Sequence, residues 1–123
     1  MRKILFIEDE AALQKTFTEI LKREGYEVVS ALDGETGLRL ARSQKLDLVL
    51  LDIVLPRLQG LEVLKALKGD PETKSIPVII LTNLESSQDI EKALALGAAT
   101  YLVKTQYTLP EIAEKIKGAV GEE

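Results

Sequence analysis

Short apolar runs alternate with amphipathic stretches along this chain, and this alternation constrains its fold more than any other feature. The apolar runs occupy residues 3–7, 27–31, 46–51, 78–81 and 100–103. Runs of this length that are rich in Val, Ile and Leu are typical of strands in a parallel sheet. Apolar residues at helical spacing follow each run, and Gly25, Gly69 and Gly97 stand where three of these helices should end. The pattern predicts an α/β fold with five β-α units.

The composition of the strands predicts their order in the sheet. Runs 3–7, 46–51 and 78–81 are almost purely aliphatic, which suits central strands. Runs 27–31 and 100–103 contain polar residues, which suits the edges. We therefore expect a doubly wound five-stranded parallel sheet of flavodoxin-like order 2-1-3-4-5, with helices on both faces and a switch point between the first and third strands.

Helix starts and helix faces can also be predicted. Asp33 is placed to cap the second helix, and Thr108 with Glu111 three residues later forms a capping box for the last one. In the fourth helix the apolar pattern predicts that Ala93 and Leu94 both face inward.

The composition excludes several classes of function. The chain contains no Cys and no His, so thiol nucleophiles, disulfides, Ser-His-Asp triads and imidazole metal ligands are excluded. A net charge of −4 argues against direct binding to nucleic acid by this chain. No apolar run reaches the roughly 20 residues of a membrane helix. We expect a cytoplasmic protein that does not bind membranes.

Polar residues stand at the carboxyl ends of four predicted strands. Glu8 and Asp9 follow the first strand, Asp52 the third, Thr82 the fourth and Lys104 the fifth. Parallel strands bring these ends to one edge of the sheet, where α/β proteins bind their ligands. Three carboxylates in one place repel each other unless a cation binds, and oxygen ligands suit Mg²⁺. Together with the hydroxyl and the amine, they predict a site for Mg²⁺ and a phosphoryl group, with Asp52 as the nucleophile.

Four sequence motifs lie at these strand ends. They are IEDE at 7–10, LLDIVLP at 50–56 with Gly60 after it, LT at 81–82 and YLVK at 101–104. In this order and at these positions, the chain resembles the CheY-like receiver domain of two-component response regulators over nearly all of its length. We therefore expect a single receiver domain over residues 1–123, with no output domain in the chain.

The resemblance implies roles for the site residues. Asp52 would accept a phosphoryl group from a histidine kinase or a histidine phosphotransfer protein. Glu8, Asp9 and Asp52 would bind Mg²⁺ together with the backbone carbonyl of Val54, and Mn²⁺ would substitute. The domain would assist its own phosphorylation and slow dephosphorylation, and it would not be a turnover enzyme.

Three further residues would couple phosphorylation to output. By resemblance, Lys104 pairs with the phosphoryl oxygens, Thr82 moves to bond one of them, and Tyr101 rotates inward behind it. The face made by the fourth helix, fifth strand and fifth helix would then bind an output domain or a protein target. The charged residues of the fourth and fifth helices could form a homodimer face, but an ordinary solvated surface explains them better.

The chain departs from the family pattern at several positions. Thr105 follows Lys104 where the family usually has proline, and Gln59 precedes Gly60 where an acidic residue or Asn is common. Asn83 replaces a small residue at the entrance for the phosphoryl group. Val54 and Leu84 occupy the two positions that influence hydrolysis in the family. Since both are apolar, we expect slow self-dephosphorylation.

Three other interpretations fit the sequence less well. A flavodoxin-like ligand binder would need a phosphate-cradling loop after the first strand, where this chain has acids, and more aromatics than three Tyr and two Phe. An aspartate-nucleophile phosphohydrolase usually has a second acid where this chain has Val54. A degenerate receiver would act as a protein-interaction module without phosphorylation, and the retained acids, Thr82 and Lys104 argue against it.

Overall fold

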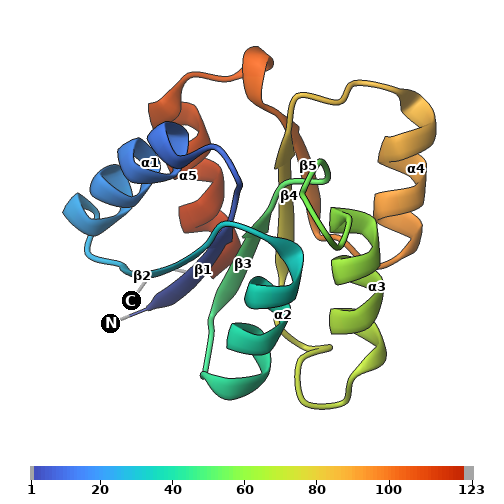
Figure 1. The fold of residues 1–123 in the computed structure, drawn as a ribbon. Coiled ribbons are helices and arrows are strands. Elements are labelled where there is room, and N and C mark those ends of the chain that lie inside the picture. The colour runs from blue at the N-terminus through green and yellow to red at the C-terminus, as the bar shows by residue number, and fades with distance from the viewer. Residues whose placement is uncertain (1, 121–123) are drawn as a thin grey trace.

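The computed structural model describes residues 2–120, so Met1 and residues 121–123 of the expected domain lie outside the described part. The strands are β1 (Lys3–Ile7), β2 (Glu27–Ala31), β3 (Leu48–Leu51), β4 (Val78–Thr82) and β5 (Thr100–Val103). The helices are α1 (Ala11–Arg23), α2 (Gly34–Ser43), α3 (Gly60–Gly69), α4 (Ser87–Ala95) and α5 (Leu109–Val120). A short 3-10 helix, η1 (Lys104–Gln106), links β5 to α5 (Figure 1).

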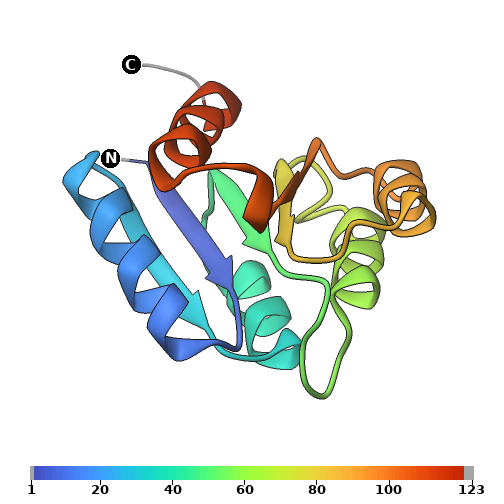
Figure 2. The same ribbon diagram turned by 90° about the horizontal axis from the view of Figure 1, so that it is seen from above.

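The strands form one parallel sheet in the order β2-β1-β3-β4-β5, which confirms the predicted topology. Helices α1 and α5 cover one face of the sheet, and α2, α3 and α4 cover the other (Figures 1 and 2). Ile7 in β1 is level with Ala31 in β2 and with Leu51 in β3. These three strands therefore end together at the switch point.

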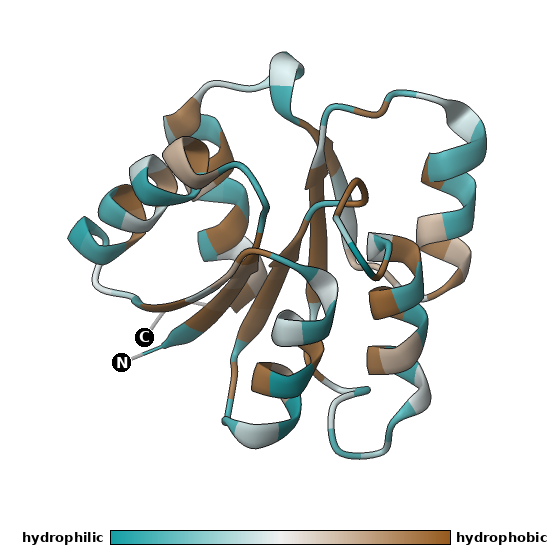
Figure 3. Cartoon of the chain, viewed as in Figure 1, coloured by the Kyte–Doolittle hydropathy of each residue, from teal (hydrophilic) through white to brown (hydrophobic). Residues whose placement is uncertain are grey.

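Alternating side chains of the strands build two separate cores. Leu5 and Ile7 point to the α2-α3-α4 side, whereas Ile4 and Phe6 point to the α1-α5 side, where Phe6 packs edge-on against Phe17 of α1 at 5.6 Å between ring centroids. The central strands are apolar along most of their length (Figure 3), and their polar residues are Lys3 at the start of β1 and Thr82 at the end of β4. Burial on both faces explains why these runs are aliphatic instead of alternating with polar residues.

The predicted helix caps are confirmed. The Asp33 carboxylate accepts a hydrogen bond from the backbone N–H of Thr36 at 2.8 Å. At the start of α5, Thr108 N–H donates to the Glu111 carboxylate at 2.8 Å, and Glu111 N–H donates to the Thr108 hydroxyl at 3.3 Å. These bonds hold the pKa of the Asp33 and Glu111 carboxyls below the usual range.

Two details differ from the prediction. β3 begins at Leu48, not at residue 46, because the N–H of Lys3 bonds to the Asp47 carboxylate in place of a strand carbonyl. The prediction that Leu94 faces inward is wrong: its side chain is 48% exposed, whereas Ala93 is fully buried. Successive helical residues point about 100° apart, and α4 turns only a narrow face to the sheet. Within residues 2–120, no helix has the length and apolar character needed to cross a membrane.

Candidate functional site

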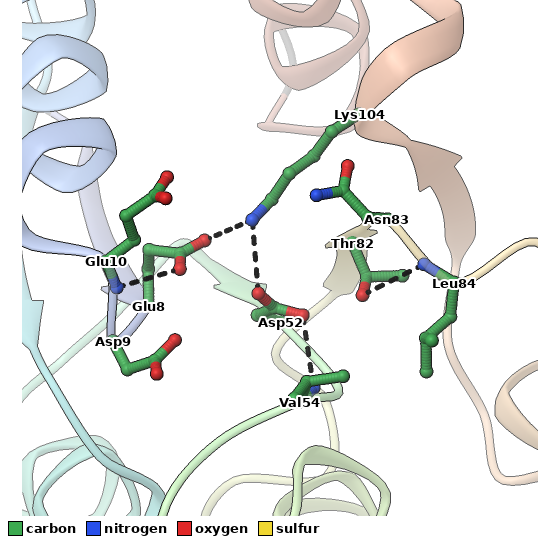
Figure 4. Close-up of a pocket in the computed structure, with 9 residues that line it drawn as sticks. All are labelled: Glu8, Asp9, Glu10, Asp52, Val54, Thr82, Asn83, Leu84 and Lys104. Carbon is green, nitrogen blue, oxygen red and sulfur yellow. Dashed lines mark hydrogen bonds and ion pairs between the residues drawn. The ribbon is translucent and has the colours of Figure 1, made fainter.

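The polar residues that were predicted from the strand ends meet in one cleft of about 430 Å³ at the carboxyl edge of the sheet (Figure 4). Its lining residues are Glu8, Asp9, Glu10, Asp52, Val54, Thr82, Asn83, Leu84 and Lys104. The cleft lies at the switch point between β1 and β3, as the topology requires.

Glu8 is the most tightly held acid in the cleft. Its backbone N–H donates to the carbonyl of Ala31 at 3.0 Å, which continues the β1-β2 ladder by one residue. One carboxylate oxygen accepts from the backbone N–H of Glu10 at 3.0 Å, and the other accepts from the Lys104 ammonium at 2.6 Å. Only 1% of Glu8 is exposed, whereas Asp9 beside it is exposed. Glu10 is the exposed N-cap residue of α1.

Asp52 projects into the cleft from the end of β3. Its backbone N–H donates to the carbonyl of Ile7 at 3.1 Å, so it extends the β1-β3 pairing. One carboxylate oxygen accepts from the backbone N–H of Val54 at 3.1 Å, and the other accepts from the Lys104 ammonium at 3.1 Å. Asp52 is 5% exposed, and this small opening faces the cleft.

Gly60 allows the loop after Asp52 to fold back onto the end of β3. Its N–H donates to the carbonyl of Ile53 at 2.8 Å. A Cβ atom at this position would lie 2.2 Å from the Asp52 carbonyl oxygen and 2.5 Å from the Ile53 Cα. Only glycine fits this close approach of two backbones. The start of α3 thereby supports the backbone that carries Asp52.

Lys104 reaches both buried acids although proline does not follow it. Residues 104–106 form η1, and the described residues contain no cis peptide bond. Burial opposes the ammonium charge, but the hydrogen bond to Glu8 and the charge of Asp52 outweigh it and raise the pKa of Lys104. Lys104 is therefore a fixed cation between two carboxylates, and Thr105 does not prevent that placement.

The pKa of Glu8 is raised as well, and burial is the main cause. The hydrogen bonds from Lys104 and from the Glu10 N–H favour the ionised form but do not fully offset burial, and the nearby charge of Asp52 adds to the rise. Glu8 and Asp52 share one ammonium, so negative charge is in excess.

The opposite wall of the cleft comes from β4 and the loop after it. Thr82 is 1% exposed, and its hydroxyl faces the cleft (Figure 4). This hydroxyl oxygen accepts a long hydrogen bond of 3.5 Å from the backbone N–H of Leu84. Asn83 is exposed at the mouth of the cleft. Tyr101 does not line the cleft; it is half-buried behind this loop, and its hydroxyl donates to the Leu84 carbonyl at 2.9 Å.

The acids fit a divalent cation. Glu8, Asp9 and Asp52 each offer a carboxylate oxygen, and these three oxygens lie within 4.8 Å of one another. The carboxylate of Glu10 also lines the cleft, and Lys104 is the one ammonium among the lining residues, so negative charge is in excess. Hard oxygen donors with one exposed member, which leaves room for water, suit Mg²⁺ better than a softer metal.

Gln14 is a buried polar residue beside the site that was not predicted from the sequence. The side chain amide of Gln14 on α1 bonds to three backbone carbonyls at the carboxyl ends of β1 and β2, and Gln14 is 7% exposed. The signal was available, because Gln14 stands three residues before Phe17 and seven before Leu21, on the buried face of α1.

Comparisons with known proteins identify the family and the fold. The model of the response regulator receiver domain family matches residues 4–117. The polar-differentiation response regulator DivK of Brucella anthropi is 36% identical over 121 residues, which cover 98% of each chain. A CheY-like receiver domain protein from Methanospirillum hungatei JF-1 superposes with a TM-score of 0.91 at 29% identity, over 98% of this chain and 94% of that one.

A further solved relative carries a metal. The receiver domain of the sensor histidine kinase PA1611 from Pseudomonas aeruginosa PAO1 was solved with a magnesium ion coordinated in its active site cleft. It superposes with a TM-score of 0.88 at 28% identity over 98% of each chain. The chain belongs to the response regulator receiver domain family of two-component signal transduction.

Proposed function

We propose that this receiver accepts a phosphoryl group on Asp52 from a phosphohistidine of a partner histidine kinase or phosphotransfer protein. The observation that carries the proposal is the placement of Asp52: its carboxylate is nearly buried, opens only to the cleft, and is held by Lys104 and the N–H of Val54. The chain has no His, so the donor imidazole must belong to the partner.

The chain's own residues position the reaction. A carboxylate oxygen of Asp52 attacks phosphorus, the new O–P bond forms, and the N–P bond of the donor breaks, leaving its electron pair on the imidazole nitrogen. Lys104 stands 3.1 Å from Asp52 and offers a positive charge to the phosphoryl oxygens. The Thr82 hydroxyl offers a hydrogen bond to another oxygen. The chain assists this transfer by positioning and electrostatics, which dominate phosphoryl transfer.

Mg²⁺ would be held by Glu8, Asp9 and Asp52, with the backbone carbonyl of Val54 as a further ligand. The spacing of the three carboxylates and their excess charge support this assignment, and so does the magnesium ion in the PA1611 receiver. When bound there, Mg²⁺ would offset the negative charge of these acids as a phosphoryl group approaches. Mn²⁺ would substitute, because it also prefers oxygen ligands.

Phosphorylation would be read out through Thr82 and Tyr101. A hydrogen bond from Thr82 to the phosphoryl group would move the loop after β4. Tyr101 contacts that loop through its hydrogen bond to Leu84. The change would reach the face made by α4, β5 and α5, where an output domain, a protein target or a second copy would bind. A local change of charge commonly shifts the equilibrium of a structural element between two arrangements.

The attached phosphoryl group would be long-lived, and the protein would not turn over substrate. Val54 is 53% exposed at the cleft and Leu84 is half-buried there. Neither side chain offers a hydrogen bond that could orient a hydrolytic water. We place this activity in the cytoplasm, where kinases of two-component systems supply their phosphohistidines.

The proposal is tested by incubation with acetyl phosphate and Mg²⁺, followed by intact mass. The wild type should gain the mass of one phosphoryl group, and Asp52→Asn should gain none. Chelation of Mg²⁺ should prevent the gain. No added mass on the wild type, or a gain that survives in Asp52→Asn, would contradict the proposal and favour a phosphorylation-independent interaction module.

A further inference from the structure

Gln14 makes the most extensive buried side-chain hydrogen bonding of the described residues outside the cleft. Its amide nitrogen lies 2.8 Å from the carbonyl oxygen of Ala31, 3.2 Å from that of Phe6 and 3.3 Å from that of Glu8. All three partners are acceptors, so the NH₂ end of the amide faces them. Two N–H groups serve three carbonyls, which agrees with one short bond and two longer, shared ones.

These bonds lie where β2 ends and the chain after β1 continues beyond it. Ala31 is the last residue of β2, and the Glu8 N–H donates to its carbonyl. The N–H and C=O of one strand residue point to the same side, so the Glu8 carbonyl also points toward β2, beyond its end. The amide of Gln14 supplies the donor that a longer β2 would have provided.

The backbone of Gln14 holds the other end of the same turn. Its N–H donates to the carbonyl of Glu10 at 3.0 Å, which is the first helical bond of α1. The turn from Glu8 to Glu10, which carries Asp9, is therefore bonded at both ends to one residue. Together with Lys104 and the Glu10 N–H on its carboxylate, this fixes Glu8 at its backbone and at its side chain.

We propose that Gln14 is a positioning residue that sets the spacing of Glu8 and Asp9 from Asp52, and so the affinity of the cleft for Mg²⁺. Gln14 does not line the cleft, so it acts through the backbone of Glu8 and not by contact with the ion. This inference rests on the proposed function, since it requires that the cleft binds Mg²⁺.

The test is Mg²⁺ binding to the unphosphorylated protein by isothermal titration calorimetry, with stability measured separately by urea unfolding. Gln14→Met keeps the length of the side chain and removes both N–H groups, and Gln14→Leu is a second apolar replacement. Thr18→Val is the matched control, because the Thr18 hydroxyl is also buried on α1 but has no hydrogen-bond partner in the structure.

We expect the dissociation constant for Mg²⁺ to rise at least about tenfold in folded Gln14→Met, and to stay unchanged in Thr18→Val. In a Glu8→Gln background, Gln14→Met should have a smaller effect, because only the displacement of Asp9 then acts on the ion. If folded Gln14→Met or Gln14→Leu binds Mg²⁺ with the affinity of the wild type, the inference is wrong. The proposed function would still stand in that case, because the wild type binds Mg²⁺. If neither variant folds, Gln14 serves the fold and not the site, and the inference also fails. Absence of Mg²⁺ binding in the wild type would refute both.

Discussion

Replacement of Gly60 by alanine should damage the fold and the site together. The added Cβ would lie 2.2 Å from the Asp52 carbonyl oxygen and 2.5 Å from the Ile53 Cα. Both atoms belong to the backbone, so no side chain can rotate away. To reach an ordinary contact the two segments must separate by roughly 1 Å, which is overpacking of a kind that costs about 1–3 kcal/mol. Alanine favours a helix over glycine by up to about 1 kcal/mol, which offsets part of this cost.

We therefore expect Gly60→Ala to lower the free energy of unfolding by about 2 kcal/mol in urea titrations. Gly118→Ala is the matched control, because Gly118 also lies in a helix and its added Cβ would have no neighbour within 4 Å. That variant should be more stable than the wild type by about 0.5–1 kcal/mol.

The same displacement should appear in the chemistry. A shift of about 1 Å in a reacting group costs up to roughly 100-fold in rate, so Gly60→Ala should accept phosphate from acetyl phosphate far more slowly than Gly118→Ala. If Gly60→Ala were as stable and as reactive as the wild type, the close approach of α3 to the end of β3 would not support Asp52.

Three other perturbations test the site. Lys104→Met leaves Glu8 and Asp52 without a cation and should lower the free energy of unfolding by about 3 kcal/mol near neutral pH without metal. Added Mg²⁺ should restore this stability in urea titrations, and wild-type stability of the metal-free variant would contradict the ion pairs. Protons compete with Mg²⁺ for Glu8, and burial raises the pKa of its carboxyl. Mg²⁺ affinity should therefore begin to fall at a higher pH than an ordinary glutamate would cause, and it should fall less in Glu8→Gln; equal pH dependence in both would contradict the role of Glu8. Val54→Asn adds a group that can orient water, so it should shorten the lifetime of the acyl phosphate, which intact mass can follow. If the acyl phosphate of the wild type lasted only seconds in Mg²⁺, slow hydrolysis would be contradicted.

Much of the fold was predictable because it depends on periodicity. Aliphatic runs identified the central strands, and short polar caps such as Asp33 identified helix starts within a residue or two. Since parallel topology brings all carboxyl ends together, the residues Glu8, Asp52 and Lys104 could be grouped before any contact was known.

What was missed depends on contacts between segments far apart in the sequence. The role of Gln14 depends on where β2 ends relative to β1, and the need for glycine at residue 60 depends on how α3 approaches β3. The exposure of Leu94 depends on how narrow a face α4 presents to the sheet. Periodicity along one segment carries none of this information.

Asp52 is the residue that we propose becomes phosphorylated. The most direct measurement treats the phosphorylated protein with borohydride, which reduces an aspartyl phosphate to homoserine, and then locates homoserine by peptide mass mapping. We expect homoserine at residue 52 and at no other aspartate, and we expect none when Mg²⁺ is removed before phosphorylation. Homoserine at Asp9 or at another position, or phosphate on a hydroxyl that resists reduction, would contradict it.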